Sequence, residues 1–249
     1  MMHSKMKAVL YICHGSRIGE ANEQAISFIQ QVMKKVDIPI QEISFLELSE
    51  PTIAQGFERC VEKGATTIIA IPILLLTAAH AKIDMPNELT KLTLRFPDIK
   101  VKFGQPIGVH EKMIDLLLER VRDTQIPIKE ESKVLLVGRG SSDPDVKRDI
   151  TRIAEMLEQR SPVKRVEVCF LTAAKPSFQE GLEEAKRSGA KQVFVIPYLF
   201  FTGILMGRIE NSIKNVNIDH KTEWILCRYL GYHPIVEEII YEQIIELSR

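Results

Sequence analysis

The sequence predicts an α/β protein made of two similar domains, each with a four-stranded parallel sheet flanked by helices. Two observations lead to this prediction. Short apolar runs alternate with segments of helical spacing along the chain, and the second half of the chain repeats the first. Alternating strands and helices favour parallel sheets joined by right-handed crossovers, and self-similarity at a fixed period indicates a repeated structural unit.

The first half contains four strand patterns, each followed by a helical pattern. The strand patterns occupy residues 8–12, 43–46, 67–74 and 99–103. Apolar residues recur at helical spacing over residues 26–36, 51–61, 86–92 and 113–121. We expect the common doubly wound strand order 2-1-3-4, in which strands 2, 1 and 3 are neighbours.

The repeat is clearest at glycine and proline positions, whose backbone roles other residues fill poorly. Residues 133–141 repeat the opening strand and the loop after it. The pairs separated by 125 residues are Pro51 and Pro176, Gly56 and Gly181, Gly64 and Gly189, Pro72 and Pro197, and Thr77 and Thr202. Near the end, Gly231-Tyr232-His233 follows Gly108-Val109-His110 by 123 residues. We infer a duplicated and fused α/β unit.

A polar stretch, residues 123–132, interrupts the alternation between the two halves. We interpret it as a linker. The predicted domains are therefore residues 1–125, which would carry the functional site, and residues 133–249, a sister domain without the metal ligands.

Composition excludes some classes of function. Lys plus Arg and Asp plus Glu each number 33, so the formal net charge is zero, which argues against a nucleic-acid binder. The sequence shows no signal-peptide pattern and no apolar run long enough to span a bilayer. Its four cysteines are far apart and form no CxxC pair. We expect a cytoplasmic monomer with reduced thiols and no membrane partner.

Three residues with metal-ligating side chains follow consecutive strand patterns of the first half. His14 and Glu47 come at the ends of the first and second strands, and His80 follows the third. Ligands of open α/β sheets bind at the carboxyl ends of the strands. A lone histidine there would most simply be structural, but three such groups on neighbouring strands are expected to converge on one site.

The second half replaces all three candidates together. The residues 125 positions later are Arg139, Thr172 and Leu205. Scaffold residues should persist in the sister half, as the glycines and prolines do. The joint replacement therefore points to one site, in the N-terminal half, facing a sister domain that supplies something else.

Two imidazoles and a carboxylate suit a borderline divalent metal such as iron, cobalt, nickel or zinc. Three protein ligands leave coordination positions open, as a catalytic or metal-transferring site requires. Neutral imidazole can also accept a proton near physiological pH. Nothing in this ligand set separates Fe²⁺ from Co²⁺.

Three short motifs surround the three candidates. They are Cys-His-Gly-Ser-Arg at 13–17, Phe-Leu-Glu at 45–47 with Pro51 following, and Pro-Ile-Leu-Leu-Leu-Thr-Ala-Ala-His at 72–80 followed by Lys-Ile-Asp-Met-Pro at 82–86. These motifs resemble those of the class II chelatases, in the branch of CbiX and SirB proteins, and the likeness covers both halves of the chain. Within the branch, the pattern is most similar to bacillus-type ferrochelatases.

This resemblance implies a lyase that inserts Fe²⁺ into sirohydrochlorin to give sirohaem, with release of two protons. It also implies that His14, Glu47 and His80 are both the metal ligands and the catalytic residues. The divalent metal, Fe²⁺ or else Co²⁺ or Ni²⁺, would be a substrate, and no prosthetic group is expected. The altered residues of the second half depart from the family motif and argue against a second metal site.

Sirohydrochlorin is rich in carboxylates, and a cleft between two similar domains would suit a flat ligand. Basic residues on strand-end loops could pair with those carboxylates. The candidates are Arg17, Lys82, Arg139 and Arg208. For Arg17, Lys82 and Arg208 taken individually, a solvated surface charge is the better explanation. Arg139 is favoured by its place in the repeat, although it could instead pair with Asp143 or Asp145.

Two neighbours of the candidate ligands are expected to have structural roles. Asp84 precedes Met85-Pro86 and should cap the N-terminus of a helix. Cys13 should point to the opposite side of its strand from His14 and lie in the core.

Two other functions stay open. One is a cobaltochelatase of the cobalamin pathway, which would use the same ligands. The other is a non-catalytic binding protein for a metal or a tetrapyrrole, which would hold both ligands without speeding insertion. A histidine phosphatase is excluded, because such an enzyme needs Arg-His-Gly after the first strand and here Cys13 precedes His14.

Overall fold

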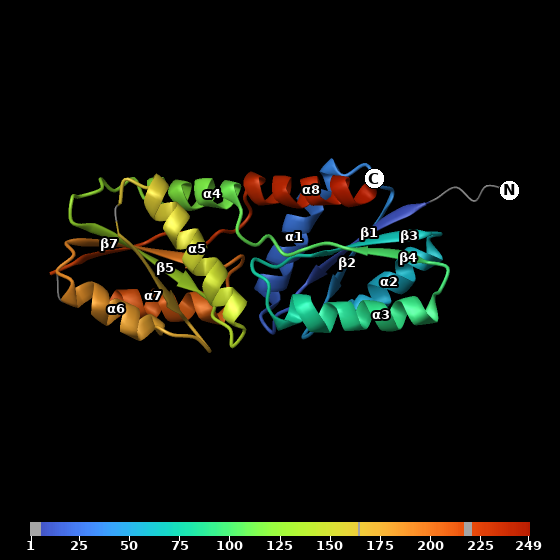
Figure 1. Ribbon diagram of the computed structural model, residues 1–249, viewed down its shortest axis with the longest axis horizontal. Coiled ribbons are helices and arrows are strands. Elements are labelled where there is room, and N and C mark those ends of the chain that lie inside the picture. The colour runs from blue at the N-terminus through green and yellow to red at the C-terminus, as the bar shows by residue number, and fades with distance from the viewer. Residues whose placement is uncertain (1–5, 164, 217–220) are drawn as a thin grey trace. The chain divides into compact units, whose positions relative to one another are not determined.

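The computed structural model describes residues 6–163, 165–216 and 221–249. Over these residues the chain forms two compact units, each a four-stranded parallel sheet between two layers of helices (Figure 1). The fold class expected from the sequence is confirmed. None of the helices in these ranges has the length and apolar character needed to cross a membrane.

The sheet of the first unit has the strand order β2-β1-β3-β4. Its strands are β1 (Lys7–Cys13), β2 (Ile40–Phe45), β3 (Thr67–Pro72) and β4 (Lys100–Phe103). After its first residue, β1 is buried along its whole length, as is typical of a central strand covered by helices on both faces. The predicted order is therefore correct, and the carboxyl ends of β2, β1 and β3 lie side by side.

Helices cover both faces of this sheet. One face is covered by α2 (Ile53–Glu62) and α3 (Met85–Arg95), and the other by α1 (Gly19–Lys35) and α8 (Pro234–Ser248). A short π-helix, η1 (His80–Asp84), leads directly into α3. A hydrophobic core that includes Leu10, Ile12, Phe57 and Leu89 joins the sheet to α2 and α3.

The second unit repeats this architecture. Its strands are β5 (Ser132–Gly138), β6 (Val166–Phe170), β7 (Gln192–Tyr198) and β8 (Glu223–Leu226), in the order β6-β5-β7-β8. One face is covered by α6 (Phe178–Arg187) and α7 (Ile204–Val216), and the other by α4 (Glu111–Arg122) and α5 (Pro144–Arg160).

The repeat extends to the way its helices begin. Thr52 accepts a hydrogen bond from the backbone N–H of Gln55, and the Gln55 side chain accepts one from the backbone of Thr52. Ser177 and Glu180 form the same capping box at the start of α6. Each box satisfies two backbone donors that a helix N-terminus leaves without partners, so the two halves begin this helix by the same device.

The compact units have other bounds than the predicted domains 1–125 and 133–249, which follow the sequence repeat and stay a prediction. The first compact unit contains residues up to Gly108 together with Pro234–Arg249, and the second contains Val109–His233. The last helix of each half thus packs on the sheet of the other half. The polar stretch 123–132 lies within the second unit, where it connects α4 to β5.

Specific polar contacts hold the exchanged helices. Arg120 of α4 is buried and donates hydrogen bonds to the carbonyl oxygens of Tyr229 (3.0 Å) and Leu230 (2.6 Å), just after β8. Gln243 of α8 exchanges hydrogen bonds with the backbone of Gln105, just after β4. An apolar helix stripe determines that the helix is buried, but two similar sheets offer it equivalent faces. The exchange is therefore decided by tertiary contacts.

Candidate metal site

Backbone hydrogen bonds fix the spacing between His14 and Glu47. The N–H of Leu46 donates to the carbonyl of Cys13 (2.8 Å), and the N–H of Glu47 donates to the carbonyl of His14 (3.1 Å). These bonds continue the pairing of β1 with β2 beyond the ends of the strands. The two side chains therefore start from a rigid, shared backbone.

Gly15 allows this close approach of the two loops. Its φ is +94°, and a Cβ atom added to it would lie 1.8 Å from the carbonyl oxygen of Glu47. A side chain would therefore meet both backbone strain and a direct clash. The glycine that follows His14 in the sequence motif is thus a requirement of the packing between the first two ligand loops.

Cys13 lies beside His14 in the chain but belongs to the hydrophobic core. Its side chain is buried, as expected from strand alternation, and burial raises the pKa of its thiol to about 12. Of the two neighbours, only His14 belongs to the group of side chains that could hold a metal ion.

His80 reaches the site by a different route from the one expected. The sequence pattern extended the third strand to residue 74, but β3 ends at Pro72, and His80 begins the π-helix η1 after an intervening loop. The Nδ1 atom of His80 lies 2.8 Å from Oδ2 of Asp84, at the other end of the same π-helix. His80 is thus carried by a helical turn instead of a strand end.

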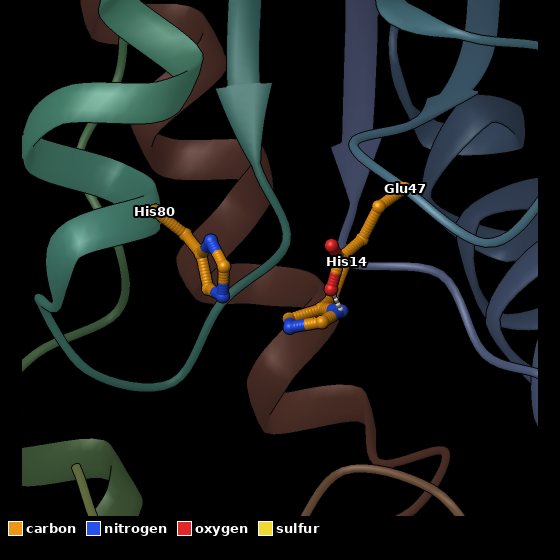
Figure 2. A group of neighbouring side chains, drawn as sticks. All are labelled: His14, Glu47 and His80. Atoms are coloured by element: carbon orange, nitrogen blue, oxygen red, sulfur yellow. Dashed lines mark ion pairs between the residues drawn. The ribbon is translucent and has the colours of Figure 1, made fainter.

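The three candidate side chains converge at one end of the first sheet (Figure 2). One ligand atom from each of His14, Glu47 and His80 lies within 4.8 Å of the other two. Nδ1 of His14 is 3.5 Å from Oε1 of Glu47, and the two imidazole rings meet edge to face with centroids 4.6 Å apart. The side chains of His14, Glu47 and His80 are 19%, 47% and 35% exposed, so a ligand from solvent can reach them.

This arrangement fits a metal with open coordination positions. Bonds of about 2.0–2.2 Å to imidazole and carboxylate place ligand atoms no more than about 4.4 Å apart. The observed limit of 4.8 Å is slightly wider, so small side-chain rotations are enough to close the three ligands on one ion. Donors of one carboxylate and two imidazoles suit borderline divalent metals.

The basic candidates are exposed side chains divided between the two units. Arg17 lies in the loop after His14, and Lys82 lies in η1 between His80 and Asp84. Arg139 directly follows β5, and Arg208 lies in α7. Their role as contacts to a substrate stays a prediction.

The alternative partners considered for Arg139 have other contacts. Asp145 pairs with Arg148, and the carboxylate of Asp143 accepts a hydrogen bond from the N–H of Asp145 at the start of α5. Across residues 6–163, 165–216 and 221–249, no ion pair of Arg139 is found. Its exposed guanidinium is therefore available to an anionic ligand.

The prediction that Asp84 caps the N-terminus of a helix was wrong. Asp84 has helical backbone angles, φ −68° and ψ −52°, and its side chain makes no capping hydrogen bond. Its carboxylate contacts Nδ1 of His80 instead. The sequence signal for this contact was the four-residue spacing of His80 and Asp84, which on a helical turn brings the two side chains together.

Comparison with known proteins agrees with the duplication and with the motifs. A family model described as CbiX matches residues 8–124 and, again, residues 133–247. A sirohydrochlorin ferrochelatase of Priestia megaterium is 52% identical over 239 residues, which cover 96% of this chain and 90% of the relative.

Two solved structures are similar over nearly the whole chain. SirB from Bacillus subtilis with Fe³⁺ is 43% identical, with a TM-score of 0.89, and the match covers 97% of this chain and 95% of that one. The sirohydrochlorin chelatase SirB from Bacillus subtilis subspecies spizizenii, in complex with cobalt, is 42% identical, with a TM-score of 0.86 and the same coverage.

Proposed function

The chain belongs to the CbiX family, and from that premise we propose that it is a sirohydrochlorin ferrochelatase, a lyase that inserts Fe²⁺ into sirohydrochlorin to give sirohaem. The observation that carries the proposal is the convergence of His14, Glu47 and His80, whose ligand atoms lie within 4.8 Å of one another. The 52% identity with a sirohydrochlorin ferrochelatase supports the choice of metal and macrocycle.

The three ligands hold the metal substrate without enclosing it. A closed structural site would use four protein ligands, whereas three leave positions that the macrocycle nitrogens can take. As Fe²⁺ moves to the macrocycle, its protein ligands are released one after another. The exposed Glu47 side chain has room to swing away during this transfer.

Insertion also releases two pyrrole protons, which need an acceptor. A neutral imidazole that has lost its metal is a base suited to proton transfer near neutral pH. His14 and His80 therefore serve first as ligands and then as proton acceptors. No covalent nucleophile or prosthetic group enters this scheme, because the metal is itself a substrate.

Basic side chains orient the macrocycle through its carboxylates. Arg17 and Lys82 lie within three residues of a candidate ligand in the same unit, and Arg139 and Arg208 of the second unit are the other two candidates. Guanidinium groups bind carboxylates through two parallel hydrogen bonds, which fixes orientation as well as position. We expect the enzyme to act in the cytoplasm and as a monomer.

A cobaltochelatase of the cobalamin pathway is the second candidate. The observation in its favour is the similar SirB structure in complex with cobalt, next to another with Fe³⁺. Both metals suit two imidazoles and a carboxylate. The two functions differ in which metal is inserted faster.

Anaerobic spectrophotometry tests the proposal. Sirohydrochlorin is mixed with Fe²⁺ or with Co²⁺, with and without the protein, and the absorption bands of the metallated product are followed. A ferrochelatase speeds the Fe²⁺ reaction far above the spontaneous rate. A non-catalytic binding protein would hold both ligands and leave the rate of insertion at the background value, which would overturn the proposal.

A further inference from the structure

The His80–Asp84 contact lies at the metal site but has no place among the three ligands. Nδ1 of His80 and Oδ2 of Asp84 are 2.8 Å apart, a normal length for a hydrogen bond to a carboxylate. The side chain of Asp84 is 48% exposed and that of His80 is 35% exposed. This contact occupies one of the two ring nitrogens of His80, so Nε2 is the nitrogen left for a metal.

The local sequence explains why the two side chains share one turn. Pro86 has no N–H, and in a regular helix its ring would clash with the carbonyl of Lys82 four residues earlier. The helix instead widens over η1, where the N–H of Met85 donates to the carbonyl of His80. Such π-helical turns are frequent at functional sites. Here the turn holds His80 and Asp84 at its two ends.

Asp84 has no competing structural role at the helix start. A capping residue has extended backbone angles and accepts a hydrogen bond from a backbone N–H. Asp143, at the start of α5, meets both conditions, with ψ 120° and a bond from the N–H of Asp145. Asp84 meets neither condition. Its carboxylate is therefore directed at His80 and not at the backbone of α3.

The sister half lacks the pair as well as the ligand. The residues 125 positions after His80 and Asp84 are Leu205 and Ile209, both apolar. Ile209 is fully buried in the core of the second unit, and Leu205 packs against that core. The first half thus has both the imidazole and the carboxylate, and the second half has neither at these positions.

We propose that Asp84 is a positioning residue of the metal site, which holds His80 in the tautomer with Nδ1 protonated and Nε2 bare. Only the bare nitrogen can bind a metal, and a carboxylate on the other nitrogen fixes the ring and raises its basicity as a ligand. This inference rests on the proposed function, because it assigns Asp84 a role at the same site. Asp84 itself does not touch the metal.

The tautomer is measured directly in the metal-free protein. Long-range ¹H–¹⁵N correlation spectra at about pH 8, above the ordinary histidine pKa of ~6.5, report which nitrogen of His80 is protonated. We expect protonated Nδ1 in the wild type and a shift toward protonated Nε2 in Asp84→Ala. Asp84→Asn keeps a carbonyl oxygen as acceptor and should restore the wild-type signal.

Metal affinity supplies the second measurement. Co²⁺ is titrated without tetrapyrrole, and we expect Asp84→Ala to bind it roughly 10–100-fold more weakly, the usual effect of losing a partner of a ligating histidine. Asp84→Asn should lose less. Glu88→Ala is the matched control, because it removes another carboxylate near the start of α3, one that pairs with Lys91 and not with His80.

The outcomes separate this inference from the proposed function. If Asp84→Ala is folded and matches Glu88→Ala in both the His80 spectrum and Co²⁺ affinity, the contact is only a surface ion pair and the inference is wrong. If Asp84→Ala shifts both measurements but the wild type fails to speed iron insertion, the inference stands and the proposed function fails.

Discussion

The loops after β1 and β5 have the same backbone geometry and different chemistry. Gly15 and Gly140 have φ values of +94° and +90°, and a Cβ atom on either would lie 1.8 Å from a carbonyl oxygen, that of Glu47 or Thr172. The hydrogen bonds that join the two loops are also repeated. Duplication thus kept the backbone at these positions and exchanged the side chains, so the proposed metal site is not a property of the fold alone.

The segments that carry His80 in the first unit and Leu205 in the second differ in backbone conformation as well as in side chain. In the first unit, the loop after β3 leads into the π-helix that carries His80. In the second unit, the loop after β7 leads into α7, which begins at Ile204, and Leu205 packs against the core. Substitution of Arg139 and Thr172 by histidine and glutamate would therefore not be enough to give the second unit a three-ligand metal site.

The largest expected effect comes from removing the proposed ligand His14 in the first half. We expect His14→Ala to reduce iron insertion to the background rate, a loss greater than the roughly 10–100-fold typical of outer-shell partners. Its thermal unfolding should match that of the wild type. His14→Ala should also lose Co²⁺ binding, whereas Arg139→Ala, at the equivalent position of the second half, should keep it. A folded His14→Ala variant with normal turnover would remove His14 from the mechanism.

Alanine at the paired glycines tests the shared loop geometry. Gly15→Ala and Gly140→Ala should each lower the free energy of unfolding of their unit by at least about 1–3 kcal/mol, the usual cost of a strained left-handed residue. Only Gly15→Ala should also weaken Co²⁺ binding, because it displaces Glu47. Calorimetry and metal titration measure the two effects. Equal loss of metal affinity in both variants would contradict the assignment of the site to one half.

Arg139, which occupies the position of His14 in the second half, should bind a carboxylate of the macrocycle. We expect Arg139→Ala to weaken sirohydrochlorin binding by roughly 1.5–3 kcal/mol, the range for hydrogen bonds to charged groups. Metal affinity without tetrapyrrole should not change. Arg152→Ala, which removes an exposed arginine paired with Glu155 on α5, is the control. An unchanged sirohydrochlorin affinity would show that Arg139 is a surface charge.

The smallest effect is expected at the counterpart of Glu47. The hydroxyl of Thr172 donates a hydrogen bond to the carbonyl of Arg139 (3.0 Å), so Thr172→Ala should cost no more than about 0.5–1.5 kcal/mol of stability. Co²⁺ affinity should stay at the wild-type value, whereas Glu47→Ala should reduce it strongly. Parallel titrations of the two variants measure this contrast.

The sequence by itself determined the alternation of strands and helices, the duplication and the three candidate ligands. Each follows from a local pattern. Buried parallel strands are continuous apolar runs, and glycines and prolines recur where the backbone needs them. His14 and Glu47 were found because a parallel sheet brings the carboxyl ends of neighbouring strands together.

Only the tertiary structure decided which sheet each terminal helix covers and how His80 is held. The apolar stripes of α4 and α8 specify burial but not a partner. Arg120 and Gln243 bond to backbone groups that are distant in the sequence, which local patterns do not predict. The same holds for Asp84. Its place before Met85-Pro86 resembles a capping position, but the turn over residues 80–84 is π-helical and the carboxylate contacts His80. Local propensity determines the helices and strands. Which of two similar sheets a helix covers, and which group a side chain contacts, are decided only when the chain packs.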